Sequence, residues 1–541
     1  MTVLSEPADT AWHQARRNFR WRLPPRFNIA AAVCDVWARR DPHRTAIIER
    51  LADGTTRQTS YEALREASCR FANVMARSGI GPGDRVAVLL PQSPAVVIAH
   101  LAIARLGAMA LPLAVLFGPD ALSFRLGHSG ASAVLLDAGG LEKLRTIKDG
   151  LPALRAIFSV DGADGEAIGF DAALAGASPD FTNADTSPDD PAMMIYTSGT
   201  TGQPKGAVHG HRVVPAHVPG LRFAHPGLGR PDDLMWTPAD WAWAGGLLNV
   251  LLPSLMLGVP VLAWAQRFQP EEAMAGIAAL GVRNAFLPPT ALRMLQAAHR
   301  PGQHYTTALR SIMSAGETLG PETFVWAREA FGLTVNELYG QTECNLVLGS
   351  CDALGVSRAG AIGKAVPGHK VAVLDVDGRV CAADELGEIA VKAPDPVMFL
   401  HYWQDEAATA AKFRNGYLLT GDQARRDEDG YVHFVGRSDD LITSAGYRIG
   451  PGEIEDCLMR HPAVAYAAVI GKKDALRTEI VKAFIVVKPG IAADDALTSA
   501  LQAFVRARLS AHEYPREIAY VASLPLTSSG KIIRRDLRTL G

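Results

Sequence analysis

Residues Tyr196–Gly206 read YTSGTTGQPKG, and this stretch decides how the rest of the sequence is interpreted. Glycine lets a backbone approach an anion closely, and hydroxyl side chains together with Lys205 are donors for phosphate oxygens. The apolar run 192–195 directly ahead is suited to a buried strand. The stretch therefore predicts a phosphate-binding loop, although Pro204 before the lysine departs from the common G-x-x-x-x-G-K-[ST] pattern. A solvated Gly/Ser/Thr linker is the alternative.

Length and charge bound the class of protein. A chain of 541 residues is longer than one ordinary domain, and a net charge of −2 gives no reason to expect a nucleic-acid partner. The six cysteines form no C-x-x-C pair, which argues against zinc or disulfide frameworks and favours the reducing cytoplasm. Polar residues, Pro and Gly interrupt the longest apolar run, 247–265, so no membrane span is expected. The oligomeric state stays open.

The order of elements predicts an α/β fold. Residues 85–137 alternate between apolar strands and helical segments, which is typical of parallel sheets covered by helices. Asp-Gly pairs at 377–378 and 429–430 lie between alternating segments and predict hairpins of a β-rich subdomain. A smaller α+β unit follows from residue 441. We expect a large N-terminal domain of helix-covered mixed sheets over 1–436, a hinge at 437–440 and a small C-terminal domain over 441–541.

Further motifs follow in the chain. They are AGET at 315–318, ELYGQTE at 337–343, YLLTGD at 417–422, GRSDDLITSAGYRIGPGEIE at 436–455 and PLTSSGKIIR at 525–534. Each alone is an ordinary feature: a helix cap, a polar loop, a turn aspartate, surface charges or a solvated lysine. Together with the first stretch, and in this order, they resemble the adenylate-forming superfamily, and most of all the medium-chain acyl-CoA synthetases. The resemblance spans the chain from about residue 30.

The resemblance implies binding sites for ATP and CoA. The implied contacts are Thr197, Ser198, Gly199, Thr200, Thr201, Gly202, Lys205, Gly316, Glu317, Thr318, Glu337, Leu338, Tyr339, Gly340, Gln341, Thr342, Asp422, Arg437, Gly446, Arg448 and Lys531. In the family the tyrosine stacks on adenine, the threonine of Gln-Thr-Glu contacts the α-phosphate, and its glutamate, here Glu343, holds Mg²⁺. A flat ring suits a base, and a carboxylate suits Mg²⁺ bound to phosphates.

The resemblance also implies roles for the later motifs. Asp422 and Arg437 are expected at the ribose hydroxyls, and Arg448 near a phosphate. Asp439 is the expected hinge, about which the small mobile C-terminal domain turns. Gly446 is expected beside the pantetheine of CoA. The expected catalytic residues are Lys205, Thr342, Glu343 and Lys531.

The implied activity is that of an AMP-forming ligase that uses ATP, Mg²⁺ and CoA to convert a carboxylic acid to an acyl-adenylate and then to a thioester. The expected substrate pocket consists of Trp243, Ala244, Gly245, Ala315 and Gly340. Acetate enzymes of the family carry a tryptophan at the place of Gly340, so a short- to medium-chain fatty acid is expected, with benzoate-type aryl acids as the alternative. Trp241 and Trp243 are equally consistent with pocket wall and ordinary packing.

Three other functions stay open at this point. One is a carrier-protein-loading adenylation domain, although no carrier-protein segment follows in this sequence. Another is a luciferase-type oxygenase. The third is a non-catalytic nucleotide-binding relative, against which the presence of Lys205, Glu343, Asp422 and Lys531 argues, because a pure binder has no need of a mobile lysine.

Overall fold

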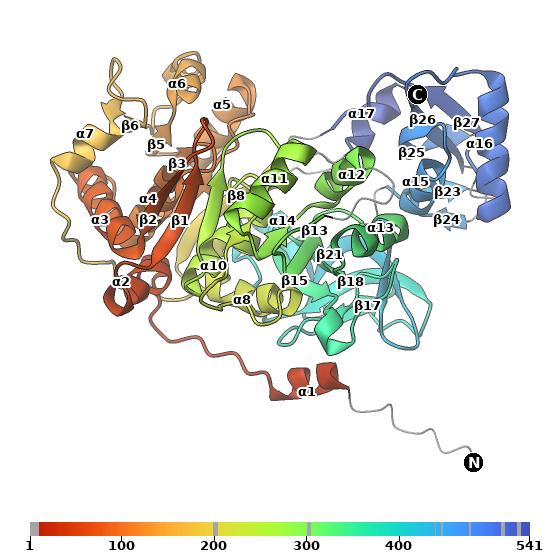
Figure 1. The fold of residues 1–541 in the computed structure, drawn as a ribbon, viewed down its shortest axis with the longest axis horizontal. Helices are drawn as coiled ribbons and strands as arrows, with labels where there is room; N and C mark the ends of the chain where they lie inside the picture. Colours follow the sequence, from red (N-terminus) through yellow and green to blue (C-terminus); the bar gives the residue numbers. More distant parts are fainter. Residues whose placement is uncertain are drawn as a thin grey trace. The chain divides into compact units, whose positions relative to one another are not determined.

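The computed structural model describes residues 10–197, 204–299, 305–438, 440–444, 447–474, 478–509, 514–526 and 532–540. By its internal contacts the chain (Figure 1) divides into two compact units. Unit 1 comprises Met1–Ala359, Gly363–Lys370 and Ala393–Lys412, and unit 2 comprises Gly360–Ile362, Val371–Lys392 and Phe413–Gly541. The expected hinge residue Asp439 lies outside the described residues, and the domain boundary at 436–441 stays a prediction.

The first large sheet of unit 1 is mixed. Its strands run in the order β16-β15-β14-β13-β12-β10-β11-β1-β2. Their bounds are β1 Thr45–Arg50, β2 Thr56–Ser60, β10 Met235–Trp236, β11 Val261–Trp264, β12 Asn284–Phe286, β13 Ser311–Ala315, β14 Val335–Gln341, β15 Cys344–Gly349 and β16 Lys364–Ala365. Parallel pairing runs through the middle of this order, along β14-β13-β12-β10-β11-β1. The outer strands β2, β15 and β16 are antiparallel to their neighbours.

The second sheet of unit 1 runs in the order β19-β9-β8-β4-β3-β5-β6-β7. Its strands are β3 Arg85–Leu89, β4 Met109–Pro112, β5 Ala133–Leu136, β6 Ala156–Ser159, β7 Ile168–Gly169, β8 Pro191–Thr197, β9 Lys205–Gly210 and β19 His401–Tyr402. Strands β4, β3, β5 and β6 pair in parallel, as the alternation of strands and helices predicted. Helix α4 (Pro94–Leu106) connects β3 to β4; it begins at a proline and ends at Gly107, whose φ of 68° is left-handed.

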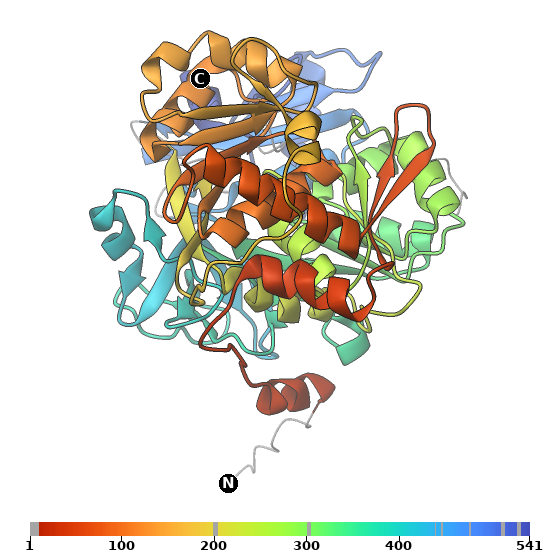
Figure 2. The same cartoon turned by 90° about the vertical axis from the view of Figure 1, so that its left-hand side faces the viewer.

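Helices cover these sheets, and Figure 2 shows the red and orange N-terminal ones lying in front of their strands. Besides α4 they are α1 Ala11–Asn18, α2 Val36–Arg40, α3 Tyr61–Arg77, α5 Pro119–Ser129, α6 Ala138–Arg145, α7 Phe170–Ala175, α8 Val213–Ala224, α9 Ala244–Gly246, α10 Leu252–Met256, α11 Pro270–Leu280, α12 Pro289–Ala298, α13 Pro321–Phe331 and α14 Glu406–Ala411, with π-helical turns at Ala31–Asp35 and Leu247–Leu251 and 3₁₀ turns at Lys148–Gly150 and Asp352–Leu354. None of the described helices is long and apolar enough for a membrane crossing.

Unit 2 contains two smaller sheets. One runs β17-β18-β21-β20, with β22 also paired to β21, and the other runs β24-β23-β26-β25, with β27 paired to β26. The bounds are β17 Val371–Leu374, β18 Leu386–Lys392, β20 Phe413–Arg414, β21 Tyr417–Arg426, β22 Val432–Arg437, β23 Ile442–Ser444, β24 Tyr447–Ile449, β25 Val464–Asp474, β26 Thr478–Val487, β27 Glu517–Tyr520, α15 Pro451–Met459, α16 Asp495–Arg508 and α17 Arg534–Thr539.

The two expected hairpins of unit 2 differ in outcome. The Asp-Gly pair at 429–430 joins β21 to β22 as an antiparallel hairpin, as predicted. The pair at 377–378 does form a tight turn, but β17 takes β18 as its ladder partner and touches the far side of its own turn only through the Leu374–Val380 bridge. The register-matched pairing with β18 runs over four residues, which explains why it prevails over the local hairpin.

Candidate active site

The YTSGTTGQPKG stretch connects two antiparallel strands. Strand β8 is buried and ends at Thr197, β9 begins at Lys205, and these two residues are register partners. The loop residues 198–203, which carry Ser198, Gly199, Thr200, Thr201 and Gly202, lie outside the described residues. A strand before the loop is therefore confirmed. The return strand β9, which holds the lysine at the mouth of the loop, was not predicted.

The Gln-Thr-Glu motif forms the turn of a hairpin between β14 and β15. Glu343 is only 7% exposed, and its Oε1 accepts a 2.5 Å hydrogen bond from the hydroxyl of Tyr402. The turn brings Thr342 and Glu343 to one edge of the sheet, while Leu338 is buried beneath it and Tyr339, its neighbour in β14, is only partly buried. The hairpin thus holds the expected metal ligand in a fixed, sheltered position.

Gly340 has a packing role beyond the one expected from the sequence. A Cβ at this position would lie 2.5 Å from both the Cα of Asn345 and the backbone nitrogen of Leu346. The two strands of the hairpin approach so closely because the register shifts between Tyr339 and Gln341. A glycine is therefore needed here by the backbone itself, whatever the size of an acyl pocket.

The AGET motif begins at Ala315, the last residue of β13, and continues beyond the strand. Strand β13 pairs in parallel with β14, where Leu338 is the register partner of Ala315. Gly316 has a φ of 98°, a left-handed conformation that favours glycine. The carboxylate of Glu317 accepts a 2.9 Å hydrogen bond from the hydroxyl of Thr290 and forms an ion pair with Arg293. The parallel pairing brings the two predicted nucleotide segments, 315–318 and 337–343, to the same edge of the sheet.

Three of the five expected acyl-pocket residues, Trp243, Ala244 and Gly245, lie at the start of α9, whereas Ala315 ends β13 and Gly340 lies in β14. Trp241 is 1% exposed, which is compatible both with ordinary packing and with the wall of a pocket. Trp243 is partly exposed, with its ring edge-on to Phe117 at 5.7 Å between centroids. A Cβ on Gly245 would meet the ring of Phe286 at 3.2 Å. Nearby, burial raises the pKa of Asp240 to about 6, a feature that sequence reasoning did not single out.

In unit 2, Asp422 and Arg437 are register partners on β21 and β22. Arg437 Nη1 donates to Asp422 Oδ1 over 3.1 Å, and Asp422 is buried. The two residues expected at the ribose are thus neighbours. Arg448 lies in β24, and nothing is described of its side chain. Gly446, Asp439 and Lys531 lie outside the described residues.

Residues 398–405 are the part of this site that sequence reasoning missed. Trp403 donates its backbone N–H to Gly206, next to Lys205, and Phe399 donates to the carbonyl of Glu343. Lys205 Nζ lies 5.3 Å from the ring centroid of Tyr402 and 3.8 Å from Asp405 Oδ2. The only signal in the sequence is an aromatic pair ahead of an aspartate that caps α14.

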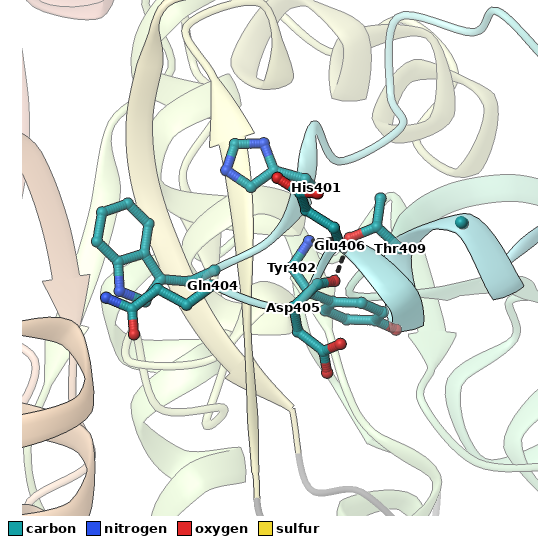
Figure 3. Close-up of a pocket in the computed structure, with 8 residues that line it drawn as sticks. His401, Tyr402, Gln404, Asp405, Glu406 and Thr409 are labelled. Atoms are coloured by element: carbon teal, nitrogen blue, oxygen red, sulfur yellow. Dashed lines mark hydrogen bonds between the residues drawn. The ribbon is translucent and has the colours of Figure 1, made fainter.

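These residues also border a pocket of about 510 Å³. His401, Tyr402, Trp403, Gln404, Asp405, Glu406, Thr409 and Ala410 line it. Figure 3 shows Tyr402 and Asp405 among these lining side chains, so the pocket adjoins the contacts of Lys205 and Glu343.

The donor set fits Mg²⁺ bound together with a nucleotide. Among the described residues no cluster of three or more His, Cys, Asp or Glu side chains is suited to hold a metal by itself. Mg²⁺ is commonly held by one or two carboxylates plus substrate phosphates, and Glu343 supplies one such oxygen donor near Lys205. The arrangement therefore suits a metal that arrives with ATP.

Comparison with known proteins defines the class. Residues 34–403 match the AMP-binding enzyme family, and residues 453–531 match the AMP-binding enzyme C-terminal domain. The chain is 34% identical to acetyl-coenzyme A synthetase of Bacillus subtilis, over 88% of this chain and 84% of that protein. It is 33% identical to the mitochondrial acyl-coenzyme A synthetase ACSM2 of Rattus norvegicus, over 95% and 92%.

The fold matches too. A crystal structure of the anthranilate CoA ligase AuaEII with anthranoyl-AMP superposes with a TM-score of 0.87 at 26% identity, over 96% of this chain and 98% of that one. The chain belongs to the AMP-binding enzyme family. Within it, the chain is an AMP-forming acid–thiol ligase.

Proposed function

We propose that this ligase activates a short- to medium-chain fatty acid with ATP and transfers the acyl group to CoA. The observation that supports this function is that Tyr402 contacts both Lys205 and Glu343. This link brings a cation and a metal-ligating carboxylate, which come from distant motifs, to the two sides of one aromatic residue. Such a pairing is what a triphosphate with its metal requires.

In the first half-reaction, a carboxylate oxygen attacks the α-phosphorus and pyrophosphate leaves. Lys205 and the loop before it bind the departing phosphates, and Thr342 donates to the α-phosphate. Glu343 would hold Mg²⁺, which would neutralise charge on the phosphate oxygens. Because this chemistry needs little acid–base catalysis, alignment and charge stabilisation provide most of the rate. Lys531 completes the set of donors.

In the second half-reaction, the thiol of CoA attacks the acyl carbonyl and AMP departs. The mixed anhydride has made the acid electrophilic, so one difficult substitution becomes two easier ones. Asp422 and Arg437 hold the ribose through both steps. Turning about Asp439 removes Lys531 and brings Gly446 to the pantetheine.

A second candidate substrate class is an aryl acid. The small residue Gly245 beside the ring of Phe286, preceded by the small Ala244, favours a slot wide enough for a benzoate, and the anthranilate ligase shares the fold. A wide apolar slot discriminates weakly between aliphatic and aromatic groups of similar size. The aliphatic acid is preferred because an acetyl-coenzyme A synthetase and an acyl-coenzyme A synthetase, at 34% and 33% identity, are more similar to this chain than the anthranilate ligase at 26%.

The test is pyrophosphate release with a panel of acids from acetate to dodecanoate together with benzoate and anthranilate, with and without CoA. We expect acid-dependent release with a maximum in kcat/KM among short to medium aliphatic acids, and thioester formation only with CoA. A maximum at benzoate or anthranilate would select the aryl alternative. Nucleotide binding without acid-dependent release would indicate the non-catalytic relative.

A further inference from the structure

Tyr402 touches the two groups that the proposed function assigns to the triphosphate and its metal. Its hydroxyl donates to Glu343 Oε1 over 2.5 Å, and the face of its ring lies 5.3 Å from Lys205 Nζ. Tyr402 is 5% and Glu343 7% exposed, so the hydrogen bond between them is sheltered from water, whereas the side chain of Lys205 is 42% exposed. None of the sequence motifs includes this tyrosine.

The backbone fixes Tyr402 from both directions. Its own strand, β19, pairs with β9, where Ala207 is its register partner. On the other side, Phe399 donates its N–H to the carbonyl of Glu343 over 2.8 Å, and its ring packs against Tyr402 at 4.8 Å between centroids. The aromatic side chain is therefore anchored by main-chain bonds both to the strand of Lys205 and to the turn of Glu343.

This placement has a chemical consequence for the carboxylate. A hydroxyl that donates to one carboxylate oxygen fixes the rotation of the group and so the direction in which the other oxygen points. Groups that hydrogen-bond a metal ligand from behind orient it, and their loss typically lowers metal affinity by about 10- to 100-fold. A short hydrogen bond to a charged acceptor is also stronger than one between neutral groups.

Asp405 offers a weaker contact to the same lysine. Its Oδ2 lies 3.8 Å from Lys205 Nζ, but the two side chains are 38% and 42% exposed. Exposed pairs of this kind are screened by water and contribute little. Its Oδ1 meanwhile caps α14 by accepting from the N–H of Ala408, which is a structural duty. Tyr402 is therefore the better candidate for organising the site.

We propose that Tyr402 is a positioning residue, which aims the carboxylate of Glu343 at the Mg²⁺ of bound ATP while its ring supports Lys205. The inference rests on the proposed metal role of Glu343. It assigns to the segment 398–405 a part in metal binding beyond that of a structural connection.

The test compares four single variants by metal binding, without turnover: Tyr402→Phe, Tyr402→Leu, Glu343→Gln and Tyr61→Phe. Tyr402→Phe keeps the ring below Lys205 and removes only the hydroxyl. Glu343→Gln removes the ligand itself. Tyr61→Phe is the matched control, because its buried hydroxyl also donates a 2.8 Å hydrogen bond, to the carbonyl of Leu255, and neither residue belongs to a predicted motif. The readouts are the Mg²⁺ concentration that gives half-maximal ATP binding and the electron paramagnetic resonance spectrum of enzyme-bound Mn²⁺–ATP.

For Tyr402→Phe we expect about a 10-fold rise in the half-maximal Mg²⁺ concentration and an altered Mn²⁺ spectrum. Saturating Mg²⁺ should restore ATP affinity, which a general packing defect would not allow. Tyr402→Leu should show the same metal defect and also bind ATP more weakly at saturating Mg²⁺, because the ring below Lys205 is lost. Tyr61→Phe should behave as wild type in both readouts.

The other outcomes decide against the inference. If Glu343→Gln raises the Mg²⁺ requirement but both Tyr402 variants behave as wild type, Tyr402 does not position the carboxylate. If Tyr61→Phe shows an equal defect, the effect is general and the inference fails as well. If Glu343→Gln itself leaves metal binding unchanged, the proposed metal role of Glu343 fails first, and the inference falls with it.

Discussion

Asp422 and Arg437 face each other across strands β21 and β22, with 3.1 Å between Oδ1 of the aspartate and Nη1 of the arginine. Asp422 is buried, whereas Arg437 is partly exposed. The arginine therefore holds the carboxylate in one orientation, and an ionised carboxylate is a good acceptor for both hydroxyls of a ribose.

Asp422→Asn should weaken ATP binding by about 10-fold or more, because hydrogen bonds to a charged acceptor are worth ~1.5–3 kcal/mol. The more specific readout is sugar discrimination. Wild type should bind 2′-deoxy-ATP and 3′-deoxy-ATP much more weakly than ATP, and the variant should lose most of that preference. Equilibrium titration with the three nucleotides measures both effects.

Asp427→Asn is the matched control for this prediction. Asp427 follows the same strand β21 and is held by His433 and the N–H of Tyr431, away from the Asp422–Arg437 pair. The control should retain wild-type discrimination between the nucleotides. If Asp422→Asn discriminates as well as the control does, the ribose assignment is wrong.

Acyl preference should respond at Gly245 and not at Gly340. Gly245→Ala places a methyl group 3.2 Å from a ring atom of Phe286, a contact that a small shift of the ring relieves. We expect kcat/KM to fall for the longest acids in the panel and to stay nearly unchanged for acetate and propionate. A chain-length profile identical to that of wild type would remove Gly245 from the pocket.

Gly340→Ala should behave differently. Its Cβ would meet backbone atoms of Asn345 and Leu346 at 2.5 Å, so the hairpin that carries Glu343 must open. We expect a lower unfolding temperature in thermal unfolding and weaker ATP binding in nucleotide titration. The loss of ATP affinity should be similar whichever acid is present. Selective loss of long acids with intact ATP binding would instead restore Gly340 to the acyl pocket.

Acid should destabilise unit 1 through its buried histidines. Burial lowers the pKa of His100 from 6.5 to about 4, and similar shifts affect His209, His217 and His225. Below pH 6.5 these histidines therefore bind protons in the unfolded chain but stay neutral in the folded chain. The stability that each neutral histidine contributes is complete above pH 6.5 and is lost as pH falls from 6.5 towards the folded pKa.

For His100 this loss amounts to about 2 kcal/mol between about pH 7.5 and pH 5, at 1.36 kcal/mol per unit of pKa difference. His100→Leu should reduce the acid-induced drop in unfolding free energy by about that amount, as measured by urea denaturation at the two pH values. An equal drop in wild type and His100→Leu would contradict the prediction.

The secondary-structure elements that were predicted best are those that local sequence patterns determine. The strands and helices within residues 85–137, the buried strand before the phosphate loop and the hairpin around Asp429-Gly430 follow from alternating patterns, an apolar run and turn residues. These signals are complete within a few residues of the chain. Strand and helix therefore form where propensity and burial agree.

What the sequence did not reveal are contacts between distant segments. Strand β19 pairs with β9 across almost two hundred residues, and no local pattern announces that partner. The tyrosine that this pairing delivers to Glu343 was consequently missed. The place of Gly340 in the acyl pocket stays a prediction. The structure adds a constraint that no sequence pattern shows, because a Cβ at this position would lie 2.5 Å from backbone atoms of Asn345 and Leu346.

We propose that adenylate formation and thioester formation use the same bound nucleotide and that Lys531 serves only adenylate formation. The direct measurement follows Lys531→Ala in each half-reaction: acid-dependent pyrophosphate release from ATP, and thioester formation from supplied acyl-adenylate and CoA. We predict a loss of about 100- to 1,000-fold in the first and near wild-type rates in the second. Equal loss in both half-reactions, or no loss in the first, would contradict the account.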